Sequence, residues 1–73
     1  MINKTDVLLK AEFVHKYLEP LVKEANERVT DLEYMRRGDN EFVTVRYRGG
    51  ANVVVCVSRD SLVTLARDVL KYI

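Results

Sequence analysis

Hydrophobic residues recur at helical spacing in the first third of the chain. Between about residues 7 and 28, apolar side chains lie three or four residues apart, and charged side chains fill the opposite side. This pattern predicts an amphipathic helix. Its apolar stripe consists of Val7, Ala11, Val14, Leu18, Leu21 and Ala25, and its polar face carries Lys10, Glu12, Lys16, Glu19, Lys23, Glu24 and Glu27. Pro20 interrupts the segment while the stripe stays in phase, which predicts a kinked helix or two abutting helices.

A strand pattern follows this helix. Residues 29–37 alternate between apolar and polar, and residues 41–48 and 51–57 are rich in Val, Phe, Thr and Tyr, which predicts three strands. Gly38-Asp39-Asn40 and Gly49-Gly50 separate the strands and favour tight turns. Ser58 is a suitable N-cap for a last helix. Its apolar stripe consists of Leu62, Leu65, Ala66, Val69, Leu70 and Ile73.

The predicted fold class is α+β, with the order α-β-β-β-α in one domain over residues 1–73. The three strands form an antiparallel meander with residues 41–48 in the middle. Two amphipathic helices need an apolar surface to cover, so we expect both to pack on one face of a single sheet.

The reading of the second turn decides which residues share a face of that sheet. If Gly49 and Gly50 are the two loop residues, Thr44 lies opposite Val55. The face under the helices then holds Leu32, Tyr34, Val43, Val45, Tyr47, Val54 and Cys56. The other face holds Glu33, Met35, Phe42, Thr44, Arg46, Arg48, Val53, Val55 and Val57. A shift of one residue in the pairing would exchange the two faces of a strand.

The second of these faces predicts a contact site. Apolar side chains beside arginines are typical of protein interfaces, and monomers rarely leave large apolar patches uncovered. The expected contact residues are Met35, Phe42, Arg46, Arg48, Val53, Val55 and Val57. The sequence therefore favours a non-catalytic regulatory or adaptor protein that binds a protein partner or forms a homodimer.

Nucleic-acid binding is the alternative function. The candidate phosphate-binding residues are Arg36, Arg37, Arg46, Arg48 and Arg59. The element order resembles that of the double-stranded RNA-binding domain, and this resemblance of topology implies RNA binding. That family has a Lys-rich start to its last helix, whereas this chain has Ser58-Arg59-Asp60-Ser61 there. The charges also nearly balance, with 12 Lys and Arg against 11 Asp and Glu, whereas nucleic-acid-binding proteins usually show a basic excess.

Catalytic and metal-binding patterns are absent from the sequence. Cys56 is the single cysteine and His15 the single histidine, so four zinc ligands of the usual kinds are not available. Cys56 lies in a Val-rich strand and is expected to be buried and inert. We expect no enzyme activity, no cofactor, no metal and no membrane span. A lone cysteine and an N-terminus unlike a signal peptide favour the cytoplasm.

Overall fold

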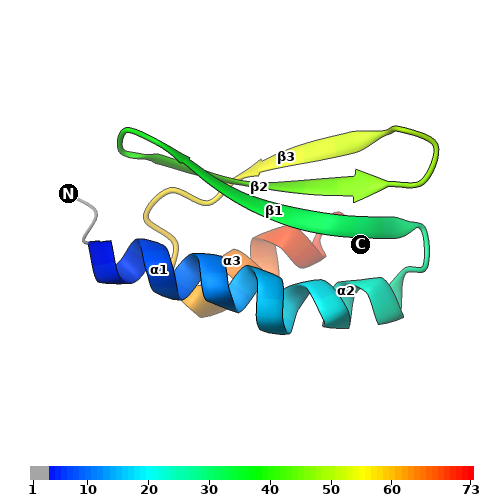
Figure 1. Cartoon of the computed structure of the whole chain (residues 1–73), viewed down its shortest axis with the longest axis horizontal. Coiled ribbons are helices and arrows are strands. Elements are labelled where there is room, and N and C mark those ends of the chain that lie inside the picture. The colour runs from blue at the N-terminus through cyan, green and yellow to red at the C-terminus, as the bar shows by residue number, and fades with distance from the viewer. Residues whose placement is uncertain (1–3) are drawn as a thin grey trace.

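The computed structural model describes the backbone of residues 4–73 and the side chains from Leu9 onward. Helical segments precede and follow one antiparallel sheet whose strand order is β1-β2-β3, so the predicted α-β-β-β-α fold is confirmed. Both helices lie on the same face of the sheet (Figure 1). Over the described residues, no helix combines the length and the apolar character needed to cross a bilayer.

The N-terminal helix is continuous and consists of α1 (Lys4–Phe13), η1 (Val14–Leu18) and α2 (Glu19–Ala25). The stretch η1 is π-helical, and the Glu19 N–H donates to the carbonyl of Val14, five residues back. Pro20 follows at once; it has no N–H to donate and its ring clashes with an ordinary α-helical turn. The wider π-turn accommodates this proline, so the predicted interruption takes the form of a π-bulge. The helix ends at Ala25, before the expected residue 28.

The first hairpin places the expected residues on the face under the helices. It joins β1 (Val29–Arg37) to β2 (Asn40–Tyr47) through a two-residue turn in which Gly38 has φ +60. Leu32 lies opposite Val45, and both lie on the predicted face. The pairing shifts between Val29 and Asp31, which marks a β-bulge. Without a bulge, residues three apart would point to opposite faces of the sheet, and the bulge lets Val29 and Leu32 both enter the core.

The second hairpin corrects the predicted register by one residue. The Tyr47 N–H donates to the carbonyl of Ala51 at 2.9 Å, so the loop has three residues rather than two. Its two glycines have φ of +90 and +94, a conformation that residues with a Cβ rarely adopt. Thr44 now lies opposite Val54 in β3 (Asn52–Cys56).

This shift exchanges the two faces of β3. Val55 and Val57 are buried and Val53 packs against the core, so their predicted place on the uncovered face is wrong. Val54 and Cys56, which were expected under the helices, are exposed. The three-residue loop is the physical reason, and it places three valines of the third strand in the core instead of Val54 and Cys56.

The core lies between the sheet and the two helices. The N-terminal helix contributes Val14, Leu18 and Val22, and α3 (Leu62–Leu70) contributes Leu65 and Val69. The remaining buried apolar residues come from the sheet and the strand that leaves it, namely Val29, Leu32, Val43, Val45, Val55 and Val57.

The helix α3 begins later than predicted. Its N-cap is Ser61, whose hydroxyl accepts a hydrogen bond from the Thr64 N–H at 3.2 Å. Ser58, the predicted cap, instead accepts from the backbone N–H of Glu41 at 2.8 Å. Ser58 therefore fastens the β3–α3 connection to the central strand.

Candidate contact surfaces

The open face of the sheet is the side that the helices do not cover. Of the predicted contact residues, Met35, Phe42 and Arg46 lie on this face, and Val54 joins them through the corrected register. Met35 and Val54 expose 42% and 58% of their surface. The other predicted contact residues are elsewhere: Val53, Val55 and Val57 on the core side, and Arg48 in the β2–β3 turn. The apolar patch is therefore smaller than the sequence predicted.

Arg46 on the open face is compensated by two carboxylates. Its Nη1 lies 2.9 Å from Asp31 Oδ2, on the residue directly opposite, and its Nη2 donates to Glu33. The hydrogen bonds that Arg46 donates to Glu33 and then to Asp31 hold its pKa above the ordinary value. The charge that was expected to attract phosphate is therefore already engaged.

The arginines of the nucleic-acid alternative divide between the two ends of the sheet. Arg36 and Arg37 end β1 beside the first turn, and Arg48 follows β2 in the second turn, at the opposite end of the hairpin (Figure 1). Arg59 lies in the β3–α3 connection, and Arg46 is paired as described above. Phosphate contacts along a groove require several unpaired cations on one surface. Arg36, Arg37 and Arg59 lie around Glu41 at one end of the sheet and Arg48 lies at the other, so the five do not share one surface.

An apolar groove lies between the N-terminal helix and α3. Its volume is about 440 Å³, and its lining residues are Phe13, Leu62, Val63, Ala66, Arg67 and Leu70. Val63 exposes 80% of its surface, an unusual degree for a large apolar residue in a helix. Leu62 and Leu70 were predicted as core residues, and both are exposed. The predicted apolar stripe of α3 therefore divides between the core and this groove.

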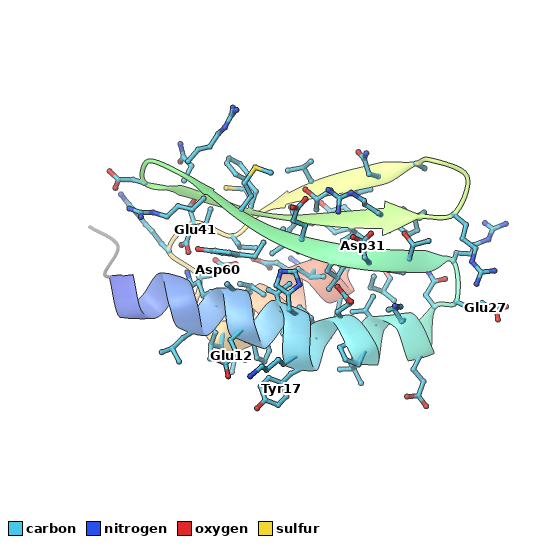
Figure 2. All side chains as sticks on the ribbon, in the orientation of Figure 1. Glu12, Tyr17, Glu27, Asp31, Glu41 and Asp60 are labelled. Atoms are coloured by element: carbon cyan, nitrogen blue, oxygen red, sulfur yellow. The ribbon has the colours of Figure 1, made fainter. Side chains whose placement is uncertain are left out.

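A row of apolar side chains extends the groove along the N-terminal helix. Leu9, Phe13, Tyr17 and Leu21 recur every four residues, and all but the half-buried Phe13 are exposed. Tyr17 exposes 64% of its surface, points away from the sheet (Figure 2), and has its ring centroid 6.3 Å from that of Phe13. The π-bulge keeps this row straighter, because a π-turn takes up more residues than an α-turn. Leu21 was predicted in the core, and this row is its actual place.

A buried polar cluster of Lys10, Tyr34 and Glu41 lies between the sheet and the N-terminal helix. The Glu41 carboxylate is fully buried, its Oε1 lies 2.7 Å from Lys10 Nζ, and its other oxygen accepts from the Tyr34 hydroxyl. Figure 2 shows Glu41 directed from the sheet towards the helices. Lys10 was predicted on the solvated face, and it is buried because this carboxylate requires a counter-charge. The cluster is best explained as structural, because it ties the N-terminal helix to the sheet, and we call it the latch.

The protonation of this cluster follows from its contacts. Burial by itself would raise the pKa of Glu41, but hydrogen bonds from Lys10, Tyr34 and the Arg59 backbone N–H outweigh it and lower that pKa. Arg59 adopts φ +66, a conformation that is rare for a residue with a side chain. Burial and the Glu41 hydrogen bond raise the pKa of Tyr34, which keeps the phenol protonated. Lys10 and Glu41 thus form an ion pair that also anchors the β3–α3 connection.

The sequence candidates for catalysis do not form a reactive pair. His15 is exposed and lies 3.8 Å from Glu19 on its own helix. Cys56, expected to be buried, is exposed, and hydrogen bonding by Ser58, first from its backbone and then from its side chain, lowers the pKa of the thiol. Among the described residues, the side-chain hydrogen-bonding neighbour of Cys56 is this serine, which is not a base. The arrangement offers no general base beside the thiol.

No protein-family model matches this chain, and searches of curated proteins and of solved structures also found no match. The function is therefore argued from the surfaces described above.

Proposed function

We propose that the chain is a small, non-catalytic regulatory or adaptor protein that binds an amphipathic helix of a partner protein in the apolar groove. The observation that carries the proposal is the gathering of exposed apolar side chains along this groove and its neighbouring row. Arg67 is the charged residue among those lining the groove. Exposed apolar surface of this kind marks protein-contact sites.

A helical partner fits the shape of the surface. The groove runs between two helices, where the side chains of a third helix can interdigitate with both. The row from Leu9 to Leu21 covers 12 residue steps, or roughly 18 Å at about 1.5 Å per residue. That length accommodates about three turns of a partner helix. We place this activity in the cytoplasm, where the exposed Cys56 thiol stays reduced.

Selection and titration together test the proposal. A displayed library of random amphipathic helices, with Leu, Ile or Phe on one face, is selected against the protein, and the best peptides are measured by calorimetry. We expect Val63→Glu to weaken their binding at least ~10-fold, because it places a charge in the apolar contact. Met35→Glu is the matched control, since Met35 is an exposed apolar residue on the open face of the sheet, outside the groove and the row beside it.

Two results would contradict this assignment. Peptides that bind Val63→Glu and the wild type equally would exclude the groove as their site. Loss of binding in Met35→Lys with retention in Val63→Glu would place the contact on the open face of the sheet instead. Binding of nucleic acid that Arg46→Ala/Arg48→Ala abolishes would favour the alternative function.

A further inference from the structure

The outer edge of β3 carries unused backbone hydrogen-bonding groups. At one end of the β2–β3 ladder, Tyr47 bonds to Ala51, and at the other end the Val57 N–H donates to the Glu41 carbonyl at 2.9 Å. Opposite residues in an antiparallel ladder alternate between bonded and non-bonded pairs. The hydrogen bonds at both ends therefore indicate that Val53 and Val55 direct their backbone groups to β2. It follows that Asn52, Val54 and Cys56 direct theirs outward.

No described residue occupies these outward groups. Neither a backbone group of residues 4–73 nor a side chain of residues 9–73 makes a hydrogen bond to the backbone of Asn52, Val54 or Cys56. The strand NVVVC also lacks charged residues and proline, the usual devices that prevent an edge strand from pairing. A recess of about 320 Å³ lies beside this edge, and its two charged lining residues, Asp68 and Lys71, compensate each other at 3.5 Å. No net charge in the recess opposes an approaching strand.

We propose that β3 pairs antiparallel with β3 of a second copy of this chain, about a two-fold axis through Val54. This register makes Val54 face Val54 of the second copy and makes Asn52 face its Cys56. Each of these pairs exchanges two backbone hydrogen bonds, so every outward group of both strands is used. The strand is self-complementary in this register, as an isologous dimer requires.

The same register continues both faces of the sheet across the axis. Val53, which is half-buried in one copy, lies opposite Val55 of the second copy on the helix side, so the two cores meet. The exposed Val54 side chains lie opposite each other on the open face, where β-branched pairs stabilise a sheet. The interface uses none of the residues that line the apolar groove, so the dimer and the proposed function can be tested independently.

Val54→Pro tests the pairing without disturbing the monomer. Because the Val54 N–H points away from β2, proline there leaves the β2–β3 ladder complete, as is tolerated in edge strands. Across the axis it removes both hydrogen bonds of the central pair. By sedimentation equilibrium we expect the wild type at twice the chain mass of 8.5 kDa, and a dissociation constant at least ~10-fold higher for Val54→Pro. Far-UV circular dichroism checks that the variant is folded.

Val54→Lys is a second variant that does not depend on proline. It places two like charges opposite each other at the axis and should also yield a monomer. Met35→Lys is its control, because it also introduces a lysine on the open face but on β1, and it should remain a dimer. A wild type at the chain mass at every concentration would overturn the proposal. So would dimers of Val54→Pro and Val54→Lys as tight as the wild type.

Cysteine cross-linking tests the register itself. Asn52→Cys places a new thiol opposite the native Cys56 of the second copy, with Cα atoms about 5.5 Å apart, within the range for a disulfide. Mild oxidation should convert this variant to covalent dimers. Met35→Cys introduces a thiol far from the axis and should yield few. Equal yields from the two variants would contradict pairing about Val54.

Discussion

The two edges of the sheet differ in how their backbone groups are protected. Along β1, the Leu32 N–H donates to Glu19 Oε2 of the N-terminal helix at 3.1 Å. The bulge at Thr30 disrupts the flat edge, and Arg36 and Arg37 add charge to its end. All three devices discourage pairing with another strand. Along β3 none of them is present among the described residues.

The unequal edges explain why pairing should stop at two copies. The N-terminal helix runs beside β1 and supplies an acceptor for one of its outward groups, the Leu32 N–H, whereas no described side chain bonds the outward backbone of β3 (Figure 1). A sheet with two open edges can add strands without limit and form fibres. A sheet with one open edge forms a closed dimer, because each copy uses the edge it has.

The largest expected effect is a difference in stability between proline substitutions at two neighbouring positions of β3. Val55 is buried and directs its N–H to β2, so Val55→Pro loses a ladder bond and packed apolar volume. We expect it to lower the free energy of unfolding by about 3 kcal/mol or more. Val54→Pro, one residue away, should change the stability of the monomer by less than about 1 kcal/mol. Urea unfolding of both variants measures this contrast, and equal losses would refute the assignment of inward and outward groups.

The next effect concerns the latch of Lys10, Tyr34 and Glu41, which anchors the β3–α3 connection. Glu41→Gln leaves Lys10 buried without a counter-charge and should lower the free energy of unfolding by about 3 kcal/mol. Chemical unfolding at neutral pH measures this loss. Glu33→Gln is the control, since that carboxylate lies half-exposed on the open face and should matter little.

The pH dependence of this latch has a definite sign. Because the pKa of Glu41 is lowered in the folded state, its contribution is present above its ordinary value of 4.5 and is lost as the pH falls through the folded pKa. Asp60 acts in the opposite direction. Its pKa is raised by burial and by the neighbouring Asp68, so its protonation favours the fold in acid. Asp60 is common to both proteins, so the wild type should lose more stability below pH 4.5 than Glu41→Gln does.

A smaller effect should follow from opening the protected edge. Glu19→Ala removes the acceptor of the Leu32 N–H and should lower the free energy of unfolding by about 1 kcal/mol. Glu19→Gln keeps an acceptor oxygen and should retain most of that stability. With both edges open, Glu19→Ala should also form species larger than a dimer at high concentration, which light scattering detects. An unchanged size distribution would show that Glu19 does not protect β1.

The smallest expected effect is that of salt. The proposed dimer rests on backbone bonds and valines, so raising the salt from about 0.05 to 0.5 M should change its dissociation constant less than ~3-fold. Sedimentation at both concentrations measures this. Binding dominated by phosphate contacts falls by orders of magnitude over a similar range, so a steep dependence would point to charged groups.

Much of the fold follows from sequence patterns. The alternation in residues 29–37 predicted the bounds of β1, and the turn between β1 and β2 predicted that Leu32 and Tyr34 share a face with Val43 and Val45. The second hairpin was harder, because Gly49-Gly50 fits a two-residue or a three-residue loop equally well. The run from Val53 to Val57 is apolar at nearly every position. Its pattern therefore does not say which side faces the core.

The candidate surfaces depend on contacts that no local pattern contains. Lys10 and Glu41 are 31 residues apart in the chain, so the latch is visible only in the folded structure. The π-bulge before Pro20 changes the helical phase, and this change takes Leu21 out of the predicted core stripe. The apolar groove needs the relative positions of two helices separated by the whole sheet.

The most direct test of whether β3 pairs and β1 does not is the solution mass of the wild-type protein. It is measured by sedimentation equilibrium over a wide concentration range. The open edge of β3 and the protected edge of β1 together predict a single association step. The mass should rise from one chain to two and then stay constant. A mass that stays at 8.5 kDa throughout, or one that keeps rising beyond two chains, would contradict the account.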